Sequence, residues 1–155
     1  MFDLLTIFLA LVVLVGFVGF MRTFFLEKSA EQKTFSAGIV PKKLPNGIYQ
    51  GSSSGYNGSW QGKKFDETNS TGINVFKNGE NLDEKFPFKT FVAKGVRDNQ
   101  QVIKIDYNIP PNPWYLRLIL DEIVEVSEDR YLGKLQVRFL PGQYFTFAFF
   151  YLKKK

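Results

Sequence analysis

The chain begins with a long run of apolar positions, and this run predicts a helix that spans a membrane. From Leu4 to Met21 there are 18 residues without a charge. A helix of this length measures about 27 Å, close to the thickness of the hydrocarbon core of a bilayer. A core helix would show a polar face, which is missing here. A cleaved signal peptide would need a basic start, but Met1 to Asp3 is not basic, and Gly19 to Met21 is a poor cleavage site. We therefore expect an uncleaved anchor over residues 1–26.

Basic residues follow the apolar run and none precedes it. Arg22, Lys28 and Lys33 lie just after the span, so the positive-inside rule predicts that the rest of the chain is cytoplasmic. The segment 27–44 is polar and shows no sustained helical or strand period. It predicts a tether between the single-pass anchor and a domain over residues 45–155.

Beyond Pro45 the apolar positions alternate with a period of two, which is typical of strands. In Val102 to Ile109, the residues Ile103, Ile105 and Tyr107 share one face, and the prolines that follow end the strand. Further strands are expected over Phe86 to Val96, Tyr131 to Phe139 and Tyr144 to Leu152. Short strands separated by regular turn signals predict an all-β domain, a small antiparallel barrel or sandwich.

The segment from Pro113 to Val126 fits two patterns. Its apolar positions match a helical face, but its β-branched residues favour a strand. We expect a helical turn at Trp114 to Arg117 and then a strand from Leu118 to Val126. In a regular strand Glu122 would point inward with Leu116, Leu118, Leu120, Val124 and Val126. A bulge at Asp121 and Glu122 would turn both carboxylates to solvent, and we favour the bulge.

The composition excludes several kinds of chemistry. The sequence has no histidine and no cysteine, so disulfides, the usual zinc sites and Ser-His-Asp or Cys-His catalytic sets cannot form. The net charge is +5, but from Leu44 to Lys155 the 15 basic and 12 acidic residues leave +3, which equals the three terminal lysines. The body of the domain is therefore nearly neutral, and nucleic-acid binding is not expected.

A short glycine and tryptophan motif points to a known family. Gly58-Ser-Trp-Gln-Gly62, continuing into Lys63-Lys-Phe-Asp66, resembles the signature of GXWXG-type domains and their companion lipocalin-like domain of unknown function. Asp121-Glu-Ile-Val-Glu-Val and the closing Phe149-Phe-Tyr-Leu-Lys153 resemble the C-terminal half of that companion domain. The resemblance implies a calycin-like β-barrel and no established reaction. The apolar helix and the proline-rich break at Pro110 to Pro113 depart from the family pattern.

Together these features predict a membrane-anchored, non-enzymatic barrel that binds a hydrophobic small molecule or lipid. It would contact the bilayer through Leu4 to Met21. The residues expected to contact the ligand are Trp60, Tyr107, Glu122, Tyr131, Phe139, Phe145, Phe147 and Phe149. Aromatic residues from Tyr131 to Tyr151 would form the wall of the cavity and Trp60 its floor, although filling a core is the simpler role for both. The alternative is a solid barrel that acts as a protein–protein interaction module with a membrane protein or a second copy. No cofactor or metal is expected.

Overall fold

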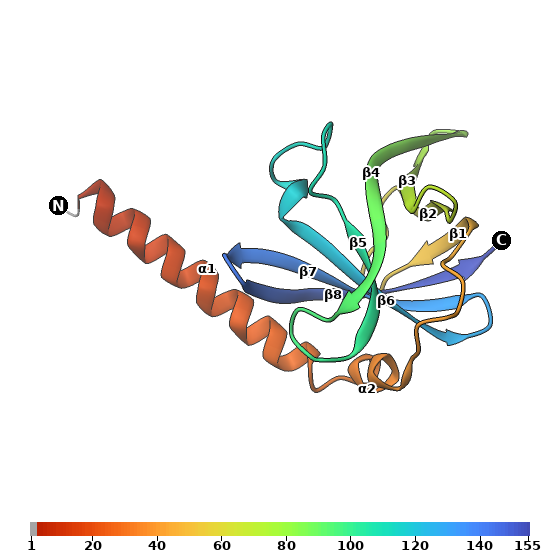
Figure 1. Ribbon diagram of the computed structural model, residues 1–155. Helices are drawn as coiled ribbons and strands as arrows, with labels where there is room; N and C mark the ends of the chain where they lie inside the picture. The colour runs from red at the N-terminus through yellow and green to blue at the C-terminus, as the bar shows by residue number, and fades with distance from the viewer. Residues whose placement is uncertain (1–2) are drawn as a thin grey trace.

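The computed structural model describes residues 3–155, which form two helices and a closed barrel of eight antiparallel strands (Figure 1). The helices are α1 (Leu4–Leu26) and α2 (Ala30–Ala37), and a 3₁₀ turn, η1, spans Leu116–Leu118. The strands are β1 (Gly47–Ser52), β2 (Trp60–Asp66), β3 (Thr71–Asn78), β4 (Asn81–Lys94), β5 (Gln101–Asp106), β6 (Ile119–Ser127), β7 (Arg130–Leu140) and β8 (Gln143–Lys154). The predicted all-β domain with an N-terminal apolar helix is confirmed, and of the two architectures the barrel is the one that forms.

Consecutive strands pair around the barrel, and β1 closes it on β8. That last seam is short, because only Tyr49–Ser52 pairs with Tyr151–Lys154. The first part of β8 therefore has β7 on one side and no strand on the other. This free edge is the place where α1 meets the barrel.

The ambiguous segment after Pro113 folds as expected, into a helical turn followed by a strand. The favoured bulge at Asp121 and Glu122 is wrong. The pairing of β6 with β5 and β7 runs through both residues without interruption, and the irregularity lies at Glu125 and Ser127 instead. Both carboxylates are buried, on opposite faces of the strand.

Alternate residues of the strands fill the barrel with aromatic rings. Ile103, Ile105 and Tyr107 point inward as predicted and join a cluster in which the rings touch edge to face. The other members of this cluster are Tyr49, Phe65, Phe88, Ile123, Tyr131, Phe150 and Leu152. Edge-to-face contacts connect Tyr49, Phe65, Phe88 and Tyr107 in sequence, with centroids 5.4 to 5.5 Å apart, from β1 to β5 across the interior. The interior is therefore occupied by side chains from opposite walls.

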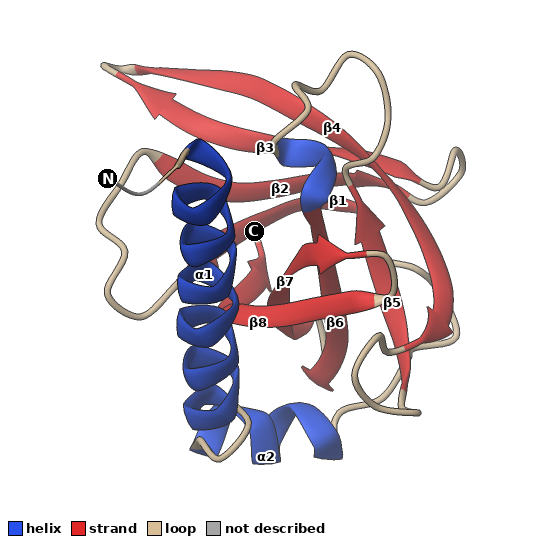
Figure 2. Ribbon diagram, turned by 90° about the vertical axis from the view of Figure 1, so that its left-hand side faces the viewer, coloured by secondary structure: helices blue, strands red, loops and turns tan. Residues whose placement is uncertain are grey.

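Part of the outer face of β5–β8 is also buried, which corrects the predicted orientation of β6. A regular strand over this segment predicts that Leu120 and Val124 point inward, but Val124 packs on the outside against Phe35 of α2. Phe35 is fully buried among Val102, Leu132 and Phe149. Phe35 falls in the segment predicted to be a tether without a regular helix or strand, whereas it lies on a helix whose N-cap is Ser29. Figure 2 shows α2 at the foot of α1, against the barrel.

Helix α1 lies along the free edge of β8. The side chain of Thr23 accepts a hydrogen bond from the backbone N–H of Thr146 at 3.0 Å, and Arg22 donates to the carbonyl of Phe147. Nearer the N-terminus of α1, an added Cβ at Gly19 would stand 2.3 Å from the ring of Phe145. These contacts supply part of the pairing that a ninth strand would otherwise give, so α1 is attached to the barrel along its C-terminal half.

Candidate functional site

The barrel interior contains one ion pair, and it is the first candidate for chemistry. Nζ of Lys63 on β2 lies 3.0 Å from Oδ2 of Asp121 on β6, and the two side chains are only 3% and 4% exposed. Asn74 on β3 accepts from Lys63 at 2.9 Å, and the hydroxyl of Tyr107 donates to Asp121 at 3.2 Å. The pair thus connects β2, β3 and β6 with the residue that follows β5.

Aromatic rings surround the ammonium group of Lys63. The rings of Trp60, Phe88, Tyr107 and Phe150 have their centroids 5.2 to 5.5 Å from Nζ. Such rings attract a cation through their negative faces and partly replace lost hydration. The indole N–H of Trp60 donates to Asn74 at 3.1 Å, so the tryptophan also belongs to this polar cluster.

Burial is the dominant influence on every ionisable group in the cluster. It lowers the pKa of Lys63 and raises the pKa of Asp121, while the mutual attraction of the pair opposes both shifts. Burial and the nearby Asp121 carboxylate hold the pKa of Tyr107 well above its usual value. Oδ1 of Asp121 has no hydrogen-bond partner among residues 3–155.

The groups of this cluster could donate and accept protons, but their burial does not suit repeated reaction with a substrate. A lysine and a carboxylate in contact resemble an acid–base pair, yet each bonds the other and both are shielded from solvent. Within the described chain, no group of three acidic residues could hold a metal ion. What the geometry shows is a lysine and a carboxylate that bond each other out of contact with solvent.

Glu122 belongs to a second buried network, on the outside of the barrel. Its fully buried carboxylate pairs with Lys104 of β5, accepts from the backbone N–H of Val96 at 2.7 Å, and accepts from Gln136 at 3.4 Å. Thr146 on β8 donates to the amide oxygen of Gln136 at 3.1 Å. The network therefore spans β5–β8 beneath the loop that joins β4 to β5.

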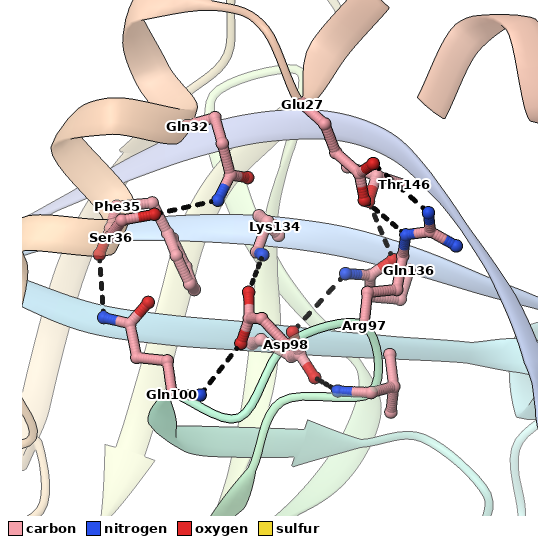
Figure 3. A network of polar contacts seen from close by, with 12 residues as sticks. Glu27, Gln32, Phe35, Ser36, Arg97, Asp98, Gln100, Lys134, Gln136 and Thr146 are labelled. Carbon is pink, nitrogen blue, oxygen red and sulfur yellow. Dashed lines mark hydrogen bonds and ion pairs between the residues drawn. The ribbon is translucent and has the colours of Figure 1, made fainter. Parts of the chain in front are cut away.

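That loop connects the network to both helices (Figure 3). Asp98 pairs with Lys134 at 3.0 Å, and Gln100 donates to the carbonyls of Phe35 and Gly38 at the end of α2. Arg97 pairs with Glu27 just after α1 and donates to the carbonyl of Tyr144 at 3.0 Å. Barrel, loop, α1 and α2 are thus joined by direct hydrogen bonds.

The eight residues predicted to contact a ligand do not come together. Trp60 and Tyr107 meet in the Lys63 cluster, and Tyr131 lies toward the end of the barrel, in edge contact with Tyr49. Glu122 belongs to the outer network, and Phe149 packs outside the barrel on Phe35. Phe139 and Phe145 contact α1 at Gly16 and Gly19, and Phe147 is exposed beneath Arg22. The predicted aromatic wall is therefore divided between the interior and α1.

Sequence reasoning missed the part that Lys63, Asn74 and Lys104 play in these two polar networks. Lys63 and Asn74 stand at inward positions of β2 and β3 and interrupt the apolar alternation there, whereas Lys104 stands at an outward position of β5, where a polar residue is expected to face solvent. The one available signal was the adjacent pair Asp121 and Glu122 within an apolar strand, since each carboxylate requires a partner on its own face.

A pocket of about 340 Å³ opens at the end of the barrel where α2 leads into β1. Tyr49 and Tyr131 reach it from inside, and Lys43, Glu125 and Lys154 are among the charged residues around it. Burial and Asp129 raise the pKa of Tyr49 to about 12. A lining so rich in charge suits a polar occupant better than a lipid chain.

Comparisons with known proteins give information on the fold alone. No family model and no curated protein matches this chain. A solved crystal structure of a protein from Thermomonospora curvata is similar, with a TM-score of 0.55 and 14% identity over 76% of this chain and 80% of that one. At this identity the likeness concerns the fold alone.

Proposed function

We propose that this protein is a single-pass membrane protein whose solid barrel serves as a protein interaction module at the membrane surface. The observation that carries the proposal is the filled interior, in which aromatic rings from opposite walls touch around the Lys63–Asp121 pair. A barrel that is full of its own side chains binds through its outer surface.

The contacts of α1 support a retained anchor over a cleaved signal. The N-terminal part of the helix exposes large apolar side chains, and its 18-residue apolar window has no buried residue. Its C-terminal half bonds the free edge of β8 through Arg22 and Thr23. Removal of the helix would expose that edge, which is a known cause of aggregation.

Binding of a hydrophobic small molecule is the second candidate, and the aromatic lining of the interior favours it. A ligand in the interior would have to displace aromatic rings such as those of Trp60 and Phe150, which contact each other with centroids 5.8 Å apart. The charged pocket where α2 leads into β1 does not suit an apolar molecule. Membership of the GXWXG-type family and a cytoplasmic domain stay predictions.

Two measurements on the full chain separate these functions. We expect native mass spectrometry of detergent-extracted protein to give the mass of the polypeptide alone. A photo-crosslinking residue placed in intact membranes at the exposed positions Ile48, Leu82, Phe91 or Val92 should give one discrete protein adduct. The same residue at Val102, buried under α2, is the control and should give none. A small molecule bound at one copy per chain, with no protein adduct, would establish the ligand carrier instead.

A further inference from the structure

The β7–β8 hairpin follows α1 into the apolar part of the helix. From the C-terminal end of α1 toward its N-terminus, Thr23 meets Thr146, Gly19 meets Phe145 and Gly16 meets Phe139. Each step toward the N-terminus of the helix is a step toward the tip of the hairpin. Figure 1 shows the same arrangement, with the hairpin reaching the middle of α1.

Two of these contacts fall inside the run that is expected to cross the hydrocarbon. Leu4 to Met21 is the apolar run, so Gly19 lies two residues and Gly16 five residues inside its end. At 1.5 Å per residue these depths are about 3 Å and about 7.5 Å. An added Cβ at either glycine would touch an aromatic ring, at 2.3 Å from Phe145 and 3.4 Å from Phe139. Hairpin and helix are thus packed closely at a depth where lipid should begin.

The same end of the barrel exposes apolar and aromatic side chains. Residue Ile119 at the start of β6 pairs with Val137 near the end of β7, so the loop before β6 lies beside the hairpin, and η1 packs on β7. In this loop Trp114 is 73% exposed, and at the tip of the hairpin Leu140 is 51% exposed. Tyr115, Leu118 and Phe147 are exposed at this end too.

Arginines accompany these aromatic residues. The guanidinium of Arg22 lies 4.7 Å from the ring of Phe147, and that of Arg138 lies 5.5 Å from the ring of Tyr144. Tryptophan, tyrosine and arginine together are the residues that membrane proteins place at the boundary between hydrocarbon and headgroups.

We propose that the β7–β8 hairpin and the β5–β6 loop insert into the interfacial region of the leaflet next to α1, giving the barrel a second, lipid-binding contact. This inference rests on the proposed membrane anchor. The occupant of the exposed apolar surface is lipid, because the anchor brings lipid to that depth and the hairpin cannot leave it without separating from Gly16 and Gly19. The arginines then face the phosphate groups of the headgroups.

The absence of cysteine from the sequence allows a direct test. Single cysteines replace Leu140, Trp114, Val13 or Glu128 in the full chain, and each is spin-labelled after reconstitution into vesicles of phosphatidylcholine and phosphatidylglycerol at a ratio of 3:1. Val13 is the lipid control on α1, and Glu128 is the water control on the opposite end of the barrel. Collisions with oxygen and with a water-soluble nickel chelate report the depth of each label.

We expect the labels at Leu140 and Trp114 to favour oxygen at least several-fold over the chelate, relative to Glu128. If Val13 lies in lipid while Leu140 and Trp114 behave like Glu128, the anchor stands and the second contact is refuted. If Val13 is also in water, the membrane anchor itself fails. If Leu140 is shielded from both reagents, protein covers the hairpin, and the lipid contact is again refuted.

Discussion

Replacement of Lys63 by methionine tests whether the interior ion pair adds net stability to the barrel or only offsets the cost of burying its two charges. At 3.0 Å and an effective dielectric constant of about 20, the attraction between Lys63 and Asp121 is on the order of 5 kcal/mol. The desolvation of two ions costs several kcal/mol each, so the pair as a whole contributes little. Removal of one partner leaves the other charge buried and should destabilise the fold by about 3–5 kcal/mol.

The full double-mutant cycle separates these contributions. We expect K63M and D121L each to lower the free energy of unfolding strongly, whereas the double variant should recover most of the loss, because methionine and leucine fill the site without charge. The assay is urea unfolding of the full chain in detergent micelles, followed by far-UV circular dichroism. K64M is the matched control, since the Lys64–Glu84 pair is about half exposed and should be worth less than about 1 kcal/mol. A double variant as unstable as the sum of its parents would refute the reasoning.

Three further predictions concern other parts of the fold. F35A should cost about 3–5 kcal/mol in the same unfolding assay and increase amide exchange along α2, because Phe35 is fully buried against the outer wall. G62A should be much more damaging than G79A: both glycines have positive φ, but a Cβ at Gly62 would stand 2.0 Å from the carbonyl of Tyr49, whereas nothing lies near Gly79. Tyr49 should make the protein sensitive to alkali. Its pKa is raised from 10.0 to about 12, so its contribution is present below pH 10 and is lost as the pH rises through 12. Y49F should make this loss smaller in an unfolding series from pH 9 to 12.5, and the part that remains comes from other buried tyrosines with a raised pKa, such as Tyr107.

Much of the architecture could be predicted because it depends on local pattern. The uncharged run of α1, the period of two in β5 and the β-branched residues of β6 are each visible within one short stretch of sequence. Strands β2 and β3 escaped this reasoning, since the inward Lys63 and Asn74 interrupt the apolar face that marks a strand. Their polarity makes sense only beside Asp121 and Tyr107, which lie far away in the sequence.

The aromatic residues predicted to line a ligand cavity show a second kind of information that the alternation of apolar residues does not contain. Period two tells which residues of β8 share a face but does not tell which face meets another element. Here α2 covers the outer side of β8, and α1 covers its edge. Phe149 therefore packs on Phe35, and Phe145 packs beside Gly19. The amphipathic character of α2 is weak over eight residues, and its N-cap Ser29 indicates where a helix can begin but not that the helix covers the barrel.

The two adjacent acids of β6 give the barrel a strong requirement for one register. Asp121 faces inward to Lys63, whereas Glu122 faces outward to Lys104, its direct partner across β5 and β6. Because neighbouring residues of a strand point to opposite faces, a slip of one residue would carry each carboxylate to the wrong side. Both lysines would then be buried without a counter-ion, at a cost of several kcal/mol each. Ion pairs that add little net stability can still exclude the slipped barrel. In this chain they also fix β6 relative to the loop that joins the barrel to α1, through the bond from the Val96 N–H to Glu122.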